Sequence, residues 1–348
     1  MIEEDPAGYT NGMEIDESLS LLERVKLYCQ SAVSVQRLVH VQELGVCAEE
    51  IGTAATLSDL VPLLNIVSCD AELSVRQALA EQLVPLARVL LAAPETTGEL
   101  EDGRTVTTYQ VVVERCVPIL SELLNSRRPI DLGVGGSAQV LDAAAEALIA
   151  LAGMLRPDDV GQTILTAVLC LAHDNETEVN RVVATQLLGA LAPVVSGELC
   201  CQFILPEIIS LADDPVFRVR KAAALKIGGL CTVVGAELSM TRLLPVYETL
   251  CRDDIWGVRK ACVESLAGVT NAVPAAARTE RLVPLLNELY SDVSRWVRTT
   301  AWSHPNLSRF QTAPGRPYSR ILAPYQAEQA RRNGIILTIS TSLRVFPL

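Results

Sequence analysis

The stretch from Leu244 to Gly268, LPVYETLCRDDIWGVRKACVESLAG, contains the pattern that decides the fold. Apolar or small residues follow Val258 at the third, fourth and eighth positions, which lie on one face of an α-helix, so this half predicts an amphipathic helix. Asp253 lies in the turn before that helix, where a carboxylate caps free N–H groups and favours the positive helix end. A proline, Pro245, lies inside the helix that precedes the turn, which we expect it to bend.

The same pattern recurs along the chain, mostly at intervals of 39 or 40 residues. Its anchor is a Val followed by Arg in four places and a Val alone in three more: Val75, Val219, Val258 and Val297, then Val35, Val140 and Val179. The interval of 65 residues between Val75 and Val140 contains two loop insertions, near 94–110 and 126–138. A period of about 40 residues is typical of HEAT and armadillo repeats, whose helix pairs bury their apolar faces only against their neighbours. We therefore expect an all-α, HEAT/armadillo-like α-α superhelical solenoid of about seven helix pairs over residues 19–302.

Five of the seven units also carry an Asp five residues before the anchor, and four carry an Arg directly after it. In HEAT folds this Arg commonly reaches the turn Asp of an adjacent unit, which predicts a structural ladder. A nucleic-acid patch at residues 218–221 is the less favoured alternative, because the basic residues recur at the repeat period. The predicted ladder comprises Asp70, Arg76, Asp174, Asp214, Arg220, Asp253, Arg259, Asp292 and Arg298.

Charge and hydropathy are distributed unevenly along the chain. The net charge is −12, but residues 303–348 hold six Arg and one Glu, which leaves about −17 for the rest, since −12 − 5 = −17. Such an acidic body disfavours nucleic acid as a partner. The most apolar helix candidate, 140–154, is interrupted by Asp142 and Glu146, so no membrane span is expected and we expect a cytoplasmic and also nuclear protein. Residues 1–18 predict an acidic disordered terminus, and 303–348 an irregular tail rich in Pro and Arg.

No catalytic, cofactor-binding or metal-binding constellation is expected. The ten Cys are scattered without a C-x-x-C pair and there are only three His, which favours buried free thiols over metal ligands. The run Gly133–Ala138 loosely fits a dinucleotide fingerprint, but no strand precedes it, so an inserted loop is the better interpretation. His173 and Asp174 lie in a turn that the repeat already explains. We therefore predict a protein that is not an enzyme and needs no cofactor.

A small group of residues near the turns is left over for binding a partner. Trp256 and Trp296 stand just before predicted second helices, where each would serve equally as an interface anchor or as packing between repeats. Lys221, Lys260 and Arg295 lie next to residues that fill the ladder, so they remain available for contacts.

At these residues the chain resembles the protein phosphatase 4 regulatory subunit 1 family, which is built of HEAT repeats. The runs that carry the resemblance are Phe217–Lys221, Val233–Gly235, Leu243–Pro245, Asp253–Cys262 and Ser291–Arg298. The resemblance implies a regulatory scaffold that binds the protein phosphatase 4 catalytic subunit, whose metals belong to that partner, and directs it to phosphoprotein substrates. It also implies that the turns near Asp214, Trp256, Lys260, Arg295 and Trp296 make the contact. The alternative is a generic HEAT-repeat adaptor in nuclear transport or cytoskeletal assembly.

The resemblance does not extend into residues 303–348. His304 and Pro305 interrupt the seventh pair where the family continues with an apolar helix. We therefore expect a truncated or alternatively spliced product, or a mispredicted end, at this point.

Overall fold

The computed structural model describes residues 15–100, 103–125 and 136–303 of the chain. Two compact units divide the protein, Met1–Val273 and Pro274–Leu348. The described residues form six successive helix pairs in the first unit and one pair in the second. The fold is thus an all-α, HEAT/armadillo-like solenoid, as the sequence period predicts.

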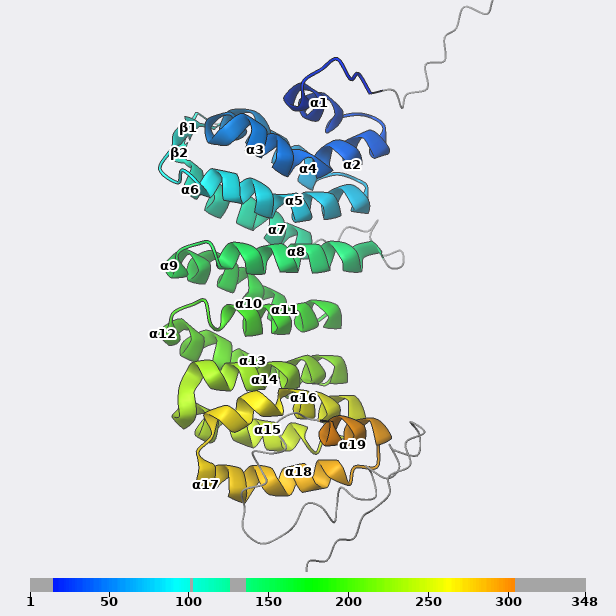
Figure 1. The fold of residues 1–348 in the computed structure, drawn as a ribbon, viewed down its shortest axis with the longest axis vertical. Helices are drawn as coiled ribbons and strands as arrows, with labels where there is room; N and C mark the ends of the chain where they lie inside the picture. The colour runs from blue at the N-terminus through cyan, green and yellow to red at the C-terminus, as the bar shows by residue number, and fades with distance from the viewer. Residues whose placement is uncertain (1–14, 101–102, 126–135, 304–348) are drawn as a thin grey trace, which may run out of the picture. The chain divides into compact units, whose positions relative to one another are not determined.

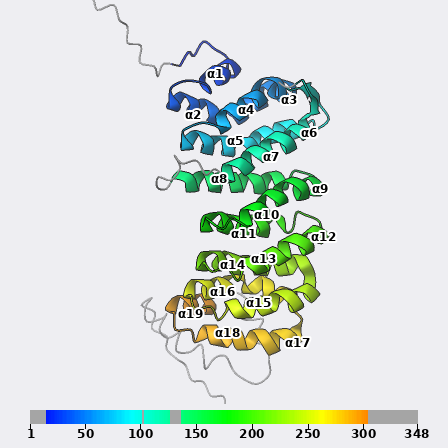
Figure 2. The same ribbon diagram turned by 180° about the vertical axis from the view of Figure 1, so that it is seen from behind.

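The helices of the first unit lie in two layers (Figure 1; Figure 2). The second helices pack side by side and include α5, α8 and α11, which face the viewer in Figure 1. The layer of second helices comprises α2 (Ser34–Gln42), α3 (Leu44–Ala55), α5 (Leu73–Leu91), α8 (Gly136–Ala152), α11 (Glu178–Leu191), α14 (Phe217–Leu238) and α16 (Trp256–Ala272). In the second unit, α19 (Arg295–Trp302) holds the same place in its pair.

The first helix of most pairs consists of a short α-helical turn, a π-helical turn (η) and a further α-helix. The first layer comprises α1 (Leu21–Tyr28); η1 (Thr56–Leu60) and α4 (Val61–Ser68); α6 (Thr108–Val111), η2 (Val112–Cys116) and α7 (Val117–Leu124); α9 (Pro157–Asp159), η4 (Val160–Leu165) and α10 (Thr166–Ala172); α12 (Gly197–Leu199), η5 (Cys200–Ile204) and α13 (Leu205–Leu211); and η6 (Ser239–Leu243) and α15 (Leu244–Leu250). The second unit contributes α17 (Ala275–Ala277), η7 (Arg278–Leu282) and α18 (Val283–Tyr290).

The repeat prolines lie at the second residue of the α-helix that follows each π turn. This holds for Pro62, Pro206, Pro245 and Pro284, and for Pro118 in the third pair. Proline lacks an N–H donor and its ring crowds the preceding turn, and a π turn is one of the few places where a helix accommodates such a change. The fourth pair has Ala167 in the place of the proline and still contains η4, so the π turn belongs to the repeat and does not require proline.

Two glycines mark the junction between one pair and the next. Gly52 in α3 has φ 78° and ψ 176°, and Gly235 in α14 has φ 83° and ψ 178°. This backbone region is open almost only to glycine, because a Cβ atom would clash with the chain itself. Each glycine therefore ends the second helix of its pair and redirects the chain into the first helix of the next.

Small residues allow neighbouring second helices to approach closely. A Cβ atom built on Gly228 of α14 would lie 2.2 Å from the carbonyl oxygen of Ser265, and one built on Gly268 of α16 would lie 2.2 Å from that of Gly228. Backbone thus meets backbone at this point. Around it the core consists of aliphatic side chains such as Ile227 and Leu266, which are 0% and 3% exposed.

The insertion near 94–110 contains a β-hairpin followed by the start of α6. Strands β1 (Thr97–Glu99) and β2 (Thr105–Thr107) pair antiparallel, with Thr97 opposite Thr107. Thr107 then caps α6, since its side chain accepts from the backbone N–H of Gln110. Most of the second predicted insertion lies outside the described residues, which resume at the first turn of α8.

Several predictions fall on residues that the structure does not describe. These are the disordered terminus up to residue 14, the first half of the glycine-rich run 133–138, and the tail from residue 304 onward. Within the described part, α19 ends at Trp302, with Ser303 as its C-cap.

By length and composition alone, two helical runs of the described chain could cross a membrane, Leu44–Ser68 and Phe217–Leu250. The sequence analysis expected none. Each run joins the second helix of one pair to the first helix of the next and contains Gly52 or Gly235 at the junction. Neither run is therefore one straight helix, and both contribute side chains to the core between repeats.

Candidate protein-interaction surface

The turn aspartates hold the chain just before each second helix. The Oδ1 atom accepts from the backbone N–H two residues further on: from Glu72 to Asp70 at 2.9 Å, from Val216 to Asp214 at 2.8 Å and from Ile255 to Asp253 at 2.8 Å. Each Asp thus lies two residues before the N-cap and accepts from the backbone N–H of the N-cap residue. The sequence analysis expected the Asp to cap the helix itself. The result is an Asx turn that fixes the entry into the helix.

Arginines from the preceding pair hold these aspartates from the other side. Arg220 donates from Nε to Oδ2 of Asp253 at 2.7 Å and from Nη2 to Oδ1 at 3.2 Å, while its Nη1 reaches the carbonyl oxygen of Asp214 at 2.8 Å. Arg181 binds Asp214 in the same way, at 2.7 and 3.2 Å. The planar guanidinium therefore bridges two consecutive turns, which is a geometry that lysine cannot reproduce.

Two of these arginines were not among the predicted ladder residues. Arg37 donates to both oxygens of Asp70 at 2.5 and 2.9 Å, and Arg181 occupies the same position in its own repeat. The anchors Val35 and Val179 are wrong by one residue, because they are 53% and 45% exposed. The buried anchors are the polar residues that follow them, Gln36 and Asn180. If the repeat pattern is shifted by one residue in these two repeats, Arg37 and Arg181 take the ladder position.

The other predicted ladder residues also make hydrogen bonds within their own turns. Arg76, Arg259 and Arg298 donate from Nη1 to the carbonyl oxygen six residues earlier, at 2.5, 2.7 and 2.5 Å. Asp174 accepts from the side-chain amide of Asn180 at 2.7 Å, and Asp292 accepts from the N–H of Ser294 at 2.7 Å. Among the described residues, the pairs that join consecutive turns include Arg37–Asp70, Arg181–Asp214 and Arg220–Asp253.

The electrostatics of these pairs agree with their geometry. The hydrogen bonds to the facing Asp raise the pKa of Arg37, Arg181 and Arg220. Burial raises the pKa of Asp70, but the hydrogen bonds from Arg37 and from the Glu72 amide outweigh it, so the net pKa is lowered. The ladder is thus built from charged groups, partly shielded from water.

The candidate turn residues lie on the outer side of the same helix ends. Trp256 is the first residue of α16 and is 46% exposed, beside Ile255 at 37%. Lys260 forms an ion pair with Glu264 on its own helix. Trp256 and Ile255 therefore form an apolar surface at the start of α16 that the packing of the repeats does not cover.

In the second unit, α19 presents a comparable surface. Trp296 is 52% exposed, and the guanidinium of Arg295 lies 4.6 Å from the centre of its ring. Val293 in the preceding turn is 92% exposed. The aromatic ring and the cation therefore form one stacked group that faces solvent.

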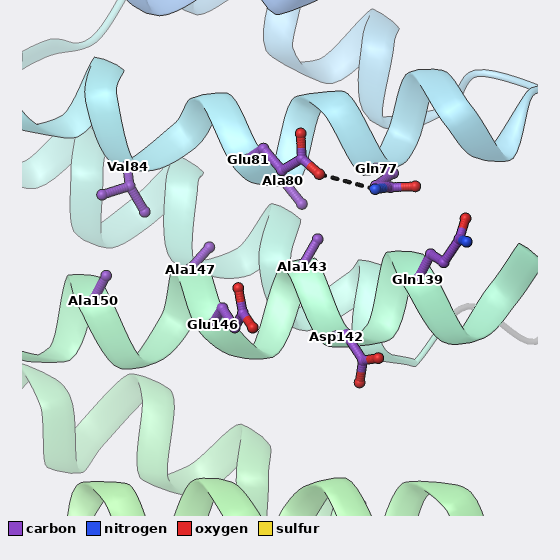
Figure 3. Close-up of a pocket in the computed structure, with 10 residues that line it drawn as sticks. All are labelled: Gln77, Ala80, Glu81, Val84, Gln139, Asp142, Ala143, Glu146, Ala147 and Ala150. Atoms are coloured by element: carbon purple, nitrogen blue, oxygen red, sulfur yellow. Dashed lines mark hydrogen bonds between the residues drawn. The ribbon is translucent and has the colours of Figure 1, made fainter.

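Neighbouring second helices also enclose grooves. The groove between α5 and α8 has a volume of about 510 Å³ and a wall of alanines, with the carboxylates of Glu81, Asp142 and Glu146 around it. Figure 3 shows Glu81 turned along α5 toward Gln77, whose amide donates to it at 2.9 Å, and Asp142 pointing away from α5. These carboxylates do not converge on one point, and the apolar part of the lining consists of Val84 and four alanines.

The groove between α11 and α14 has a different lining. Its volume is about 530 Å³, and it contains the exposed apolar side chains Val179, Phe217 and Leu225 together with Lys221. Lys221, a candidate turn residue, thus lies beside apolar residues that the sequence analysis did not propose as partner-binding residues. Sequence spacing gives little signal for this groove, since its two walls come from repeats 39 residues apart.

The described histidines and cysteines serve mainly in packing. His40 is buried, stacks on Tyr28 with ring centres 4.6 Å apart and contacts the carbonyl oxygen of Gln36, while His173 lies 3.6 Å from Glu207. No group of three possible metal ligands occurs among the described residues. Burial raises the pKa of Cys29 and Cys116 to about 12, so these thiols stay protonated. The prediction of buried thiols is wrong for Cys69, Cys170 and Cys201, which are exposed.

Comparisons with known proteins agree with this description of the fold. The HEAT repeat model matches residues 204–234, which cover α13 and most of α14. Among curated proteins, none matches the chain significantly.

Similar solved structures are found among nuclear transport proteins. One is a structure of Kap95p with RanGDP, with a TM-score of 0.66 at 14% identity over 92% of this chain. Another is the karyopherin Kap121p bound to the extreme C-terminus of the protein phosphatase Cdc14p, with a TM-score of 0.58 at 17% identity over 90% of this chain. This chain spans only 40% and 32% of those two proteins. At such identities the likeness shows the fold alone: an α-α solenoid of the HEAT type.

Proposed function

We propose that the chain is a regulatory scaffold, without chemistry of its own, that binds the protein phosphatase 4 catalytic subunit. The observation that carries this proposal lies in the run Asp253–Cys262, the strongest part of the resemblance. Val258, Ala261 and Cys262 are fully buried, so HEAT packing accounts for them. Trp256 is 46% exposed in the same run, and packing does not account for an aromatic side chain in that position.

The exposed residues have the chemistry of an interface anchor. Tryptophan supplies a large apolar contact with one hydrogen-bond donor, and it is enriched where few residues carry most of the binding energy. Phe217 opens α14 as Trp256 opens α16, and it is 39% exposed. The two neighbouring helices α14 and α16 thus present aromatic residues at equivalent positions, which would let one partner contact both repeats.

A scaffold of this kind acts by placement. If it binds the phosphatase and a phosphoprotein together, the second encounter becomes intramolecular and the local substrate concentration rises. The metal ions that activate water would belong to the catalytic subunit. We also propose that this occurs in the cytoplasm and the nucleus.

Co-purification of the tagged full chain from cell lysate tests the proposal. Stoichiometric recovery of the protein phosphatase 4 catalytic subunit is expected, together with its loss on Trp256→Ala. Phe203→Ala is the matched control, because Phe203 is an aromatic residue 42% exposed on η5 in the other layer, and it should leave recovery unchanged. Absence of the catalytic subunit from the wild-type sample would refute the proposal, and recovery of transport receptors or tubulin in its place would favour the generic adaptor.

A further inference from the structure

The groove between α11 and α14 combines exposed apolar side chains with an available cation. Val179 is 45% exposed, and Phe217 and Leu225 are each 39% exposed, yet all three line one groove. Ala222 lies between the latter two along α14 and is too short to fill the space. The volume of about 530 Å³ lies in the range of pockets that bind ligand groups.

The charges around the groove differ from those of the rest of the chain. Glu178 of α11 and Arg218 of α14 form an ion pair, which neutralises both. Lys221 is exposed and makes no hydrogen bond or ion pair within the described residues. Of the other cations on α11 and α14, Arg181 pairs with Asp214 and Arg220 pairs with Asp253, while Lys226 does not line the groove. The lining of this groove therefore carries one uncompensated positive charge.

We propose that this groove binds a short segment of a partner protein in which a large apolar side chain stands within a few residues of a single Asp or Glu. The apolar side chain would cover Val179, Phe217 and Leu225, and removal of that surface from water supplies the attraction. The carboxylate would pair with Lys221, whose neighbourhood is partly desolvated by the same contact.

The number of carboxylates follows from the charge of the whole chain. Without residues 303–348 the net charge is about −17, since −12 − 5 = −17, so a run of several acids would be repelled over most of the surface. One acid can be neutralised locally by Lys221, while a basic segment would meet the same cation unfavourably. The inference rests on the proposal that this chain binds proteins, and it is independent of whether the phosphatase is the partner.

Two matched substitutions on α14 test whether the apolar wall of the groove binds the partner segment. Leu225→Asp places a charge in the apolar wall, and Val233→Asp makes the same change at a residue 37% exposed on α14 that does not line the groove. Because both side chains are already exposed, both variants should fold, which circular dichroism melting checks. For the cation, Lys221→Glu is compared with Arg242→Glu, an exposed residue on η6 with the same change in net charge.

Selection of random twelve-residue peptides on the immobilised full chain tests the inference. Peptides enriched on the wild type should share a large apolar residue with an Asp or Glu within three positions, and should bind Leu225→Asp at least about tenfold more weakly but Val233→Asp about equally. Selection on Lys221→Glu should replace the acid by Lys or Arg, whereas Arg242→Glu should not. Failure to enrich any peptide, peptides without this pattern, or equal binding to Leu225→Asp would overturn the inference. Co-purification of the phosphatase is scored separately, so the two proposals can fail independently.

Discussion

Replacement of Arg220 by Ala tests how consecutive repeats are held together. The change removes two hydrogen bonds to Asp253 and those to the Asp214 and Pro215 carbonyl oxygens. It leaves the Asp253 carboxylate, whose side chain is 8% exposed, without that cation. Charge-assisted hydrogen bonds contribute about 1.5 to 3 kcal/mol, and loss of one partner of a buried pair costs about 3 to 5 kcal/mol. Since Arg220 is 19% exposed, we expect a loss of about 2 to 4 kcal/mol.

The matched control for this change lies two residues earlier. Arg218 also forms an ion pair with an acid of a neighbouring second helix, but its side chain is 65% exposed. Surface pairs of this kind contribute at most about 1 kcal/mol, so Arg218→Ala should change stability little. Because a repeat protein can open locally, hydrogen exchange of the amides in α14 and α16 is the measurement of choice. Equal loss of protection in both variants would refute the argument that the partly buried Arg220 guanidinium stabilises the contact between the two repeats.

Three further predictions follow from single features. Gly235→Ala should destabilise the protein by about 1 to 3 kcal/mol in urea denaturation, because φ there is 83°, whereas Gly229→Ala in the regular part of α14 should be neutral or stabilising. Because the pKa of Asp70 is lowered in the folded protein, its contribution to folding stability is complete above its unfolded pKa of about 3.9 and is lost as pH falls through the folded value. The difference in melting temperature between wild type and Asp70→Asn should therefore shrink below about pH 4. Ellman's reagent should label three of the ten thiols in the native protein, those of Cys69, Cys170 and Cys201, because they are exposed. Labelling of the buried thiols before unfolding would contradict this prediction.

The repeat architecture can be predicted from sequence because each pair repeats the same local solution. Val219 and Val258 are 39 residues apart, and both are 0% exposed at the third position after an extended N-cap. An apolar residue in this place packs against the next pair, so the period is imposed by packing between neighbours. The positions of the turn aspartates follow from the same geometry.

The pattern is unreliable where a polar residue takes the buried anchor. Gln36 and Asn180 are each 7% exposed and hydrogen-bond within their own turns, so the nearest Val is an exposed neighbour and the register shifts by one. The π turns are equally hidden, because the fourth pair forms η4 without the proline that marks the others. Neither feature changes the hydrophobic period from which the fold is predicted.

The candidate surface is predicted only in part for a related reason. Trp256 and Lys221 attract notice as residues that the ladder does not use, but their exposure depends on how the helices start. The groove beside Lys221 also needs Val179, which comes from the preceding repeat and which the sequence assigned to the core. Contacts between repeats are therefore the part of the site that a single repeat pattern does not contain.

The helical period separates stability from recognition at the start of each second helix. Counted from the N-cap Ile255, the first residue Trp256 faces solvent, the third residue Val258 is buried, and the fourth, Arg259, binds the carbonyl oxygen of its own turn. In α14 the same count gives Phe217, Val219 and Arg220, and the fifth residue, Lys221, faces the groove. Because the outward positions make no contact that the fold requires, they can change with the partner while the buried positions keep the repeats together.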